Sequence, residues 1–360
     1  MNNVTTHMTP QPERANRSYA VHVPPVKSVM VLTGVSGLVR GAFGDSILRQ
    51  AKQAVMLDIE AIERCEYFIP QVMVTEFLWE IERRAKEVNL GLLAAPVLSL
   101  ANYGSWGRYV LAAGTLGEAL ARAAASLNYH STGDWMQVVA GGGAARISFV
   151  HAVRGRRGYS HVACGTVAVI FSILRAYLSP GFPVQRIELD VPRPPTRTPF
   201  EDAYQCPVIF DAPAISVCLD AALLNQPSRA TAPRALITLE DVARALAEQA
   251  SAGSYLGVVL SHIRAQVQTG VVSVDSTARA MGTSVRTLQR VLRRDNGVDF
   301  RELSNTVRLQ RAEELLRGSN VSITQIAMDF GYSSPANFSR AFRKASGVAP
   351  HEYRQRLVAK

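Results

Sequence analysis

Two short segments near the C-terminal end carry side chains that can read the edges of DNA base pairs. Arginine binds guanine through O6 and N7, and asparagine or glutamine binds adenine through N6 and N7. The outer face of the first helix carries Arg286, Gln289, Arg290, Arg293 and Arg294, and that of the second carries Asn337, Ser339, Arg340, Arg343 and Lys344. The pattern predicts two recognition helices in the major groove, and each good contact would discriminate between bases by about 1–3 kcal/mol.

Polar residues on such faces can also contact phosphates, which position a protein without specifying sequence. Any single arginine could instead be a solvated charge or half of an ion pair, so the prediction depends on the whole set. Phe338 and Phe342 are four residues apart, which favours a place in the core over stacking on a base.

Each predicted recognition helix follows a short helix and a glycine turn, the order of a helix-turn-helix motif. In residues 273–297 the first helix starts at Asp275 or Ser276, the chain turns at Gly282, and Ser284 caps the second helix.

Residues 322–350 repeat the same order. Ser322 starts the first helix, Gly331 turns the chain, and Ser333 or Ser334 caps the second helix. The residues between the copies, 300–317, predict an uninterrupted amphipathic helix. Such a connector would hold the two recognition helices in fixed relation, about 34 Å apart if both enter one face of the duplex.

Most of the positive charge lies in this same part of the chain. Residues 253–360 contain 16 Lys and Arg against 8 Asp and Glu, which is +8 of the net +10. Lysine and arginine neutralise phosphates and release counterions, so the asymmetry is typical of a polyanion-binding domain. Charge alone does not separate DNA from RNA or from a membrane surface.

The N-terminal part mixes helices and strands, which predicts an α+β domain. Thr115, with Glu118 three residues on, has the spacing of a capping box at the start of a helix. Helical spacing also covers residues 47–55, 77–85 and 159–178. Strands are predicted over residues 29–35, 184–191, 208–210 and 215–219, and a hairpin over 135–140 and 145–151. No strand is predicted after residue 236, so the last domain is all-α.

Several function classes are disfavoured. The four cysteines lie far apart and predict buried, reduced thiols rather than a metal site or disulfides. No motif for a nucleophile elbow, a phosphate loop or a zinc protease occurs, so we expect no catalytic residues, no cofactor and no metal. The longest apolar run, 162–174, is too short to span a bilayer, and the first twenty residues lack an apolar signal core. We therefore expect a cytoplasmic protein that does not contact a membrane.

Residues 255–355 resemble the DNA-binding domain of the AraC family of bacterial transcription regulators. The resemblance is carried by residues 284–300, Arg308 with Ala312, Ile326 with Ala327, and residues 331–354, which read GYSSPANFSRAFRKASGVAPHEYR. Leu292 departs from the phenylalanine that the family often has there. By position, the resemblance implies that base edges are read by Arg286, Gln289, Arg290, Asn337 and Arg340. It implies that phosphates are contacted by Arg293, Ser339, Arg343 and Lys344. Activation through RNA polymerase is the common behaviour of the family.

A second set of motifs lies in the N-terminal part: GLLAAPV at 91–97, TLGEAL at 115–120, and later Phe200, Tyr204, Cys206 with Pro207, and Phe210. With these motifs, residues 92–227 resemble the sensor domain, labelled arabinose-binding-like, of the AraC-type subgroup that includes ornithine-utilisation and virulence regulators. The resemblance implies an effector pocket and a homodimer, without naming the effector. A basic cluster after the predicted hairpin could bind an anionic effector through paired hydrogen bonds, and nearby aromatic side chains could line its pocket. The candidate effector residues are Arg154, Arg156, Arg157, Trp106 and Tyr109. A solvated loop and ordinary core aromatics are the alternatives.

The sequence thus predicts a flexible tail (1–24), an effector-sensing and dimerisation domain (25–225), a linker (226–252) and a double helix-turn-helix domain (253–360). An effector would favour the dimer arrangement that presents both readers to double-stranded DNA. The alternatives are an effector-independent DNA-binding protein and an enzyme that carries a DNA-targeting module.

Overall fold

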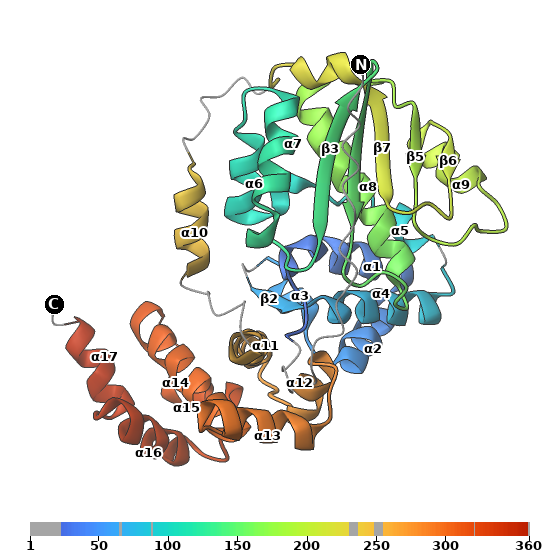
Figure 1. The fold of residues 1–360 in the computed structure, drawn as a ribbon. Coiled ribbons are helices and arrows are strands. Elements are labelled where there is room, and N and C mark those ends of the chain that lie inside the picture. Colours follow the sequence, from blue (N-terminus) through green and yellow to red (C-terminus); the bar gives the residue numbers. More distant parts are fainter. Residues whose placement is uncertain are drawn as a thin grey trace.

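The computed structural model describes residues 23–64, 67–87, 89–229, 237–247, 255–319 and 321–358. The predicted flexible tail (1–24) lies outside these ranges except for its last two residues, and Cys65 lies outside them as well. Figure 1 shows a larger part that contains every labelled strand and a smaller, purely helical part beneath it, which ends at the C-terminus.

A layer of helices forms the lower half of the first domain (Figure 1). Its helices are α1 Val35–Phe43, α2 Asp45–Val55, α3 Ile59–Ile62, α4 Gln71–Ala85 and α5 Leu90–Leu93. Beside them, β1 Val26–Ser28 pairs antiparallel with β2 Phe68–Pro70 in a two-stranded ribbon. The predicted helical spacing over 47–55 and 77–85 is confirmed by α2 and α4. Leu48, Phe77 and Ile81 on these helices are fully buried in one core.

A five-stranded sheet forms the upper half, with the strand order β3-β4-β7-β5-β6. The strands are β3 Trp135–Gly141, β4 Ala144–Val150, β5 Arg186–Glu188, β6 Val208–Ile209 and β7 Ile215–Asp220. Only the β5–β6 pair is parallel. The predicted hairpin is confirmed: Trp135 pairs with Val150, and Gly142 and Gly143 turn the chain with positive φ.

Helices cover one face of this sheet. They are α6 Gly104–Leu111, α7 Leu116–Ala125, α8 Tyr159–Tyr177 and α9 Thr198–Tyr204, with short 3₁₀ turns at Leu100–Asn102, Leu127–Tyr129 and Ala221–Asn225. A further 3₁₀ turn, Val29–Leu32, packs in the lower core with α1, α2 and α4. The predicted capping box starts α7: the Thr115 hydroxyl accepts from the Glu118 amide, and the Glu118 carboxylate accepts from the Thr115 amide.

Helix α8 confirms the predicted buried helix over 159–178. It is the one described helix that is long and apolar enough to cross a membrane. Most of its residues are buried between α4, α5, α7 and the sheet, however, which identifies it as the core helix of the domain.

The predicted strand over 29–35 is wrong. Residues Val29–Leu32 form a 3₁₀ turn capped by the Ser28 hydroxyl, and Gly34, with φ of 87°, starts α1. A short apolar run does not by itself distinguish a strand from a buried helical segment. The strand lies just before this run, in β1. The predicted strand over 184–191 is shorter than expected, because only β5 within it is paired.

The second domain is all-α over the residues described. Its helices are α11 Tyr255–Gln268, α12 Val274–Ala280, α13 Val285–Asn296, α14 Phe300–Gly318, α15 Ile323–Asp329, α16 Pro335–Ser346 and α17 Pro350–Val358. Within the predicted linker, α10 Leu239–Ala247 packs beside α6 (Figure 1). Val242 of α10 is fully buried in the first-domain core.

The β1–β2 ribbon joins the two domains. Val26 and Phe68 pack into the same core as Val258 and Val259 of α11. Three hydrogen bonds between described residues cross the same boundary. Gln268 Nε2 donates to the Tyr67 hydroxyl at 2.7 Å, Arg279 Nη1 donates to the Ala54 carbonyl at 3.2 Å, and the Ser276 hydroxyl donates to the Val55 carbonyl at 3.5 Å. The helix that precedes the first recognition helix is therefore in direct contact with the first domain.

Candidate DNA-binding surface

Helices α12 and α13 form the first helix-turn-helix motif. Gly282 turns the chain between them with φ of 64°, and the Ser284 hydroxyl caps α13 by accepting from the Thr287 amide. Leu288 and Leu292 are fully buried, so they hold the inner face of α13 against the core. The expected start at Asp275 or Ser276 is wrong: Ser273 is the cap of α12, because its hydroxyl accepts from the Ser276 amide.

Helices α15 and α16 repeat the motif. Ser322 caps α15, Gly331 turns the chain with φ of 73°, and the Ser334 hydroxyl caps α16 by accepting from the Asn337 amide. Phe338 and Phe342 are fully buried, which confirms that they are core residues. Both motifs are thus assembled from the same sequence devices, a hydroxyl cap and a glycine in the left-handed region.

Helix α14 connects the motifs, as predicted. Asp299 caps it and forms a reciprocal capping box with Glu302, with both hydrogen bonds at 2.9 Å. Its buried residues face the core of the second domain: Phe300, Leu303, Val307, Ala312 and Leu316. The helix packs against α11 and α17, so the two recognition helices are carried on one helical body.

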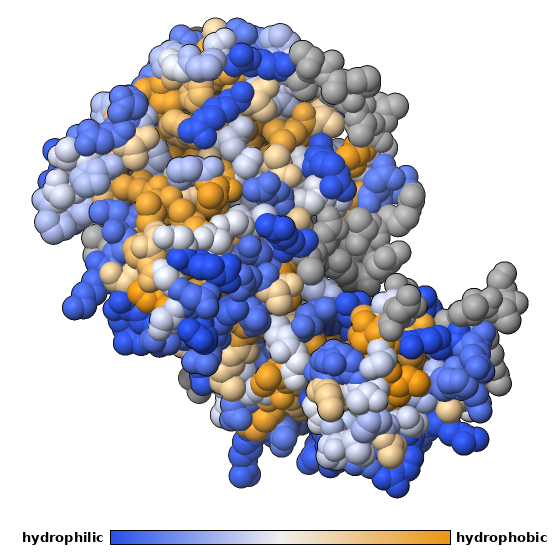
Figure 2. Space-filling model, turned by 180° about the vertical axis from the view of Figure 1, so that it is seen from behind, coloured by the Kyte–Doolittle hydropathy of each residue, from blue (hydrophilic) through white to orange (hydrophobic). Residues whose placement is uncertain are grey.

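The outer faces of α13 and α16 carry the predicted DNA-contacting side chains. Arg286, Arg290, Arg293, Arg340, Arg343 and Lys344 are exposed, and Gln289, Asn337 and Ser339 are half-buried. Across the described chain, only Arg293 of these cations has a carboxylate within 4 Å, that of Asp299 at 3.9 Å. Figure 2 shows the second domain from behind with a mostly hydrophilic rim. Cations without ion-pair partners are available to DNA.

Two of the predicted base-reading residues interact with each other in α16. The Asn337 side-chain oxygen accepts from Arg340 Nη2, and Asn337 Nδ2 donates to the Ser333 hydroxyl at 2.5 Å. This chain of hydrogen bonds orients the guanidinium of Arg340, which reduces the conformational entropy that the side chain would lose on binding any partner.

Both halves of the chain match families of known proteins. Residues 47–228, just over half of the chain, match the family described as the N-terminal arabinose-binding domain of AraC transcription regulator. Residues 277–356 match a helix-turn-helix domain family.

The chain belongs to the AraC family of transcription regulators.

Individual AraC-type relatives match to different extents. The ornithine utilization regulator of Pseudomonas aeruginosa is 24% identical over 271 residues, which cover 75% of this chain and 79% of that protein. The activator RhaS of Escherichia coli is 38% identical over 84 residues, 23% of this chain and 30% of RhaS. The regulator GlxA of Rhizobium meliloti is 40% identical over 79 residues, 22% of this chain and 24% of GlxA. The chain therefore spans less than a third of the last two.

Solved structures include the regulator CdpR from Pseudomonas aeruginosa, 24% identical, with 74% of this chain and 86% of that chain covered at a TM-score of 0.36. The DNA-binding domain of AdpA, solved in complex with a target DNA, is 27% identical and covers 32% of this chain and 93% of its own at a TM-score of 0.25. The curated relatives are regulators of transcription rather than enzymes. This AraC-family protein is accordingly a DNA-binding transcription regulator.

The five predicted effector residues do not lie together in one pocket. Arg154 donates to the carbonyls of Pro213 and Ala212 and lies 3.3 Å from Asp190 Oδ2. Arg157 lies over the ring of Trp79, 4.9 Å from its centroid.

Trp106 is buried and donates to the Ser126 hydroxyl at 2.8 Å, and the ring of Tyr109 lies under the guanidinium of Arg122. Arg156 is the exception among the five, because it lines a cleft between the two domains.

The first domain contains a buried charge network that was not predicted from the sequence. Lys27 Nζ lies 2.8 Å from Asp134 Oδ2, with the two side chains 8% and 0% exposed. Lys27 Nζ is also 3.2 Å from His151 Nδ1, and His151 Nε2 is 2.7 Å from the Thr166 hydroxyl. The Thr166 hydroxyl donates its one proton to the Val162 carbonyl, so it accepts from Nε2 of His151. Nε2 therefore carries the proton of the neutral ring, and Nδ1 accepts from Lys27. The one feature of the sequence that indicated this network was Lys27, a lysine inside an apolar stretch.

Burial determines the protonation states in this network. Burial lowers the pKa of His151 to about 4 and that of His130 to about 3, so both rings are neutral at pH 7. Burial also opposes ionisation of Asp134, but the charge of Lys27 and its hydrogen bond hold the pKa of that carboxyl well below its usual range. The network therefore contains one full ion pair and the neutral ring of His151.

The described cysteines are not suited to thiolate chemistry. Cys164, Cys206 and Cys218 are buried and free, which confirms the prediction for these three. Burial raises the pKa of Cys164 to about 12 and that of Cys206 to about 11, so their thiols stay protonated. Among the described residues, no group of three or more His, Cys, Asp or Glu side chains could hold a metal ion.

Proposed function

We propose that α13 and α16 enter the major groove of one double-stranded DNA site, about 34 Å apart. Base edges are contacted by Arg286, Gln289, Arg290, Asn337 and Arg340, and phosphates by Arg293, Ser339, Arg343 and Lys344. The observation that carries this proposal is that both recognition helices present exposed arginines without a carboxylate partner among the described residues, on one body held by α14.

We further propose that a small-molecule effector sensed by residues 25–225 controls DNA binding, with residues 226–252 joining that domain to 253–360. The effector changes the population of domain arrangements that can present both recognition helices. Support comes from the contacts of α11 and α12 with the first domain, since a change there reaches α13 through directly packed elements.

The regulator activates transcription by recruiting RNA polymerase. This part of the proposal is supported by RhaS, a named activator that is similar to the DNA-binding domain. Promoter output measured with and without the gene for this protein tests the sign of control. Output that falls when the gene is deleted supports activation, and output that rises contradicts it.

The regulator acts as a homodimer, because one chain supplies readers for one half-site and a second copy supplies them for the other. Strand β3 lies at the edge of the sheet, and its Trp135 and Val139 are 49% and 52% exposed. An edge strand with apolar side chains is suited to contact a second copy. Light scattering measures the molar mass of the wild type and of Trp135→Glu in solution. A dimeric wild type and a monomeric variant support the contact, and an unchanged molar mass contradicts it.

Selection of bound fragments from the source genome, with the full chain at physiological salt, tests the DNA-binding proposal. A recurrent site with two recognition blocks about one helical turn apart supports it. Recovery of unrelated fragments, with affinity governed mostly by salt, favours the alternative of an effector-independent, non-specific binder.

A further inference from the structure

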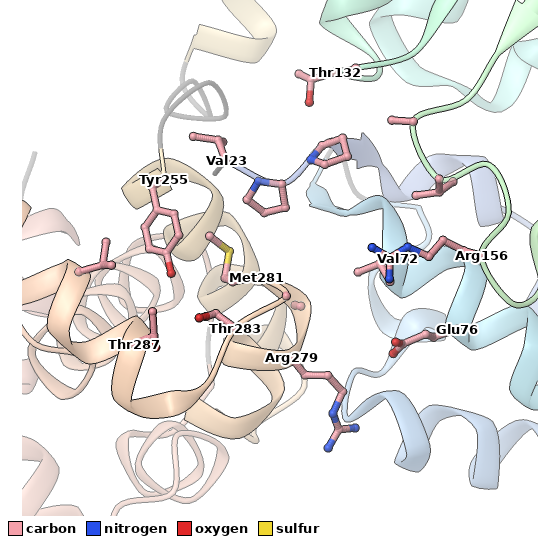
Figure 3. Close-up of a pocket in the computed structure, with 18 of the residues that line it drawn as sticks. Val23, Val72, Glu76, Thr132, Arg156, Tyr255, Arg279, Met281, Thr283 and Thr287 are labelled. Carbon is pink, nitrogen blue, oxygen red and sulfur yellow. The ribbon is translucent and has the colours of Figure 1, made fainter. Parts of the chain in front are cut away.

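A cleft of about 950 Å³ lies between the two domains. Figure 3 shows Arg156 and Val72 of the first domain on one side and Tyr255, Met281 and Thr283 of the second on the other. A cleft of this size is in the range that holds small-molecule ligands, which bind preferentially at domain interfaces. Neither the DNA-reading surface nor the core of the first domain accounts for it.

The lining of the cleft is strongly basic. Arg156 comes from the first domain, and Arg279, Arg290 and Arg294 come from the second, whereas Glu76 is the one acid among the lining residues. Arg279 donates to the Ala54 carbonyl, and Arg294 pairs with Asp295.

Arg156 and Arg290 differ from these two. Among the residues that the structure describes, no carboxylate lies within 4 Å of the guanidinium of either one. The cleft thus offers one uncommitted guanidinium from each domain, a donor set that matches a carboxylate or phosphate.

The remaining lining is apolar with a few hydroxyls. Val72, Val153 and Met281 supply hydrophobic surface, and Tyr255 and Thr283 supply hydroxyl groups. A free inorganic ion would leave this apolar surface in contact with water. The composition therefore fits an oxyanion attached to an apolar body, since the apolar part adds favourable burial to the charge interaction.

The cleft adjoins the DNA-reading face of α13. The α13 residues that line it are Thr287, Arg290, Val291 and Arg294, which follow helical spacing along one stripe. The proposed DNA-contacting residues are Arg286, Gln289, Arg290 and Arg293, a stripe displaced by one residue. Neighbouring residues on a helix are 100° apart, so the two stripes are adjacent, and Arg290 belongs to both.

We propose that the interdomain cleft binds a small organic anion, held by Arg156 and Arg290, and that this anion competes with DNA for Arg290. The inference rests on the proposed function only in the role of Arg290 as a DNA contact. A ligand that uses Arg290 lowers the affinity for DNA, and DNA lowers the affinity for the ligand by the same factor. This sign is opposite to the sequence-based expectation that an effector favours the DNA-competent arrangement.

Benzoate, a carboxylate on an apolar ring, is the probe, and benzyl alcohol is its neutral counterpart. Calorimetric titration of benzoate into the full chain measures direct binding without DNA. We expect benzoate to bind, benzyl alcohol not to bind, and Arg156→Gln to weaken benzoate binding about tenfold. Arg108→Gln removes an equal charge from an exposed site on α6 and keeps wild-type benzoate binding. Equal binding by Arg156→Gln and the wild type overturns the site.

The second measurement is the apparent Kd for DNA with benzoate added, compared with chloride at the same ionic strength. At ten times its own Kd, benzoate raises the apparent Kd for DNA about tenfold if the two compete. Benzoate that binds without changing the apparent Kd overturns the competition.

A third outcome is that Arg156→Gln weakens binding to all DNA sequences, while benzoate does not change the apparent Kd of the wild type for DNA. That outcome shows that the cleft arginines contact DNA phosphates instead of a small anion. Failure of the proposed function is distinct, because it appears as absent DNA binding without benzoate.

Discussion

The ammonium nitrogen of Lys27 lies 2.8 Å from a carboxylate oxygen of Asp134, and both side chains are almost excluded from solvent. Lys27 is the middle residue of β1, and its neighbour Val26 is fully buried in the core of the DNA-binding domain. One short strand therefore connects the charge network of the first domain to the core of the second. The ion pair, together with backbone hydrogen bonds of Val26 and Ser28, holds β1 in place, and β1 forms part of the domain interface.

Replacing Lys27 with methionine leaves the Asp134 carboxylate buried without its cationic partner. Breaking one side of a buried ion pair typically costs about 3–5 kcal/mol, so we expect the free energy of unfolding in urea to fall by that amount. The double variant Lys27→Met with Asp134→Leu recovers part of the loss, because no uncompensated charge remains.

Arg40→Gln is the control for the Lys27 variant. It removes two surface ion pairs, with Asp45 and with Glu60, and leaves the urea midpoint nearly unchanged, because exposed pairs contribute little. A loss in Lys27→Met no larger than that of the control would show that Asp134 is stabilised by its other hydrogen bonds.

Stability should fall on acidification below about pH 6.5. Burial lowers the pKa of His130 to about 3 and those of His151 and His262 to about 4, from an ordinary value of 6.5. These rings stay neutral in the folded chain but gain protons in the unfolded chain. Their contribution is thus fully present above pH 6.5 and is lost as the pH falls toward 4. Each adds a slope of up to about 1.4 kcal/mol per pH unit.

Urea unfolding at pH 7.5, 6.0 and 5.0 measures this slope. His262→Gln should reduce it by up to about 1.4 kcal/mol per pH unit. The matched change His351→Gln, at an exposed position of α17, should leave it unchanged. Identical slopes for the His262 variant and the wild type would mean that the ring is charged in the folded protein or accessible to solvent.

Arg340→Ala should reduce discrimination at particular base pairs of the selected site. A lost bidentate contact to guanine costs about 1–3 kcal/mol, so affinity for the preferred site falls about tenfold or more, while affinity for a site altered at that base changes little. Binding titrations on the two duplexes measure this difference. Lys344→Ala is the comparison, because loss of a phosphate contact weakens both duplexes equally and reduces the salt dependence. Equal weakening of both duplexes by Arg340→Ala would make it a phosphate contact.

The sequence predicted those features of the fold that depend on nearby residues. The capping box of Thr115 with Glu118, the cap at Ser284 and the turn at Gly331 each involve residues within a few positions of one another, so spacing alone identifies them. The arginines and the lysine of the predicted recognition faces are exposed for the same reason, since buried and exposed sides of a helix alternate with its period.

Features that depend on distant residues could not be predicted. Lys27 and Asp134 are 107 positions apart, and no local spacing indicates that they meet. Arg154 belonged to a basic cluster in the sequence, but the fold brings Asp190 and two carbonyls to its guanidinium. The role of Arg156 likewise depends on where the second domain lies. Charge clusters predict polar surroundings, whereas the partner of each charge is set by tertiary contacts.

Gly158 is the residue that allows α8 to approach α4. Its φ is 72°, and a Cβ atom there would lie 2.2 Å from the Thr75 carbonyl oxygen and 2.9 Å from the Trp79 amide nitrogen. Gly158→Ala therefore combines an unfavourable backbone conformation with a steric clash against backbone atoms, which cannot move as a flexible side chain can.

Gly181→Ala separates these two effects. Gly181 has a nearly equal φ of 77°, but a Cβ atom there would have no neighbour within 4 Å. We expect Gly181→Ala to lower the free energy of unfolding by about 1–2 kcal/mol, the cost of a left-handed conformation. Gly158→Ala should cost about 1–3 kcal/mol more, because the clash forces α4 and α8 apart. Urea unfolding of the two variants measures the difference, and equal losses would show that α4 moves at no cost.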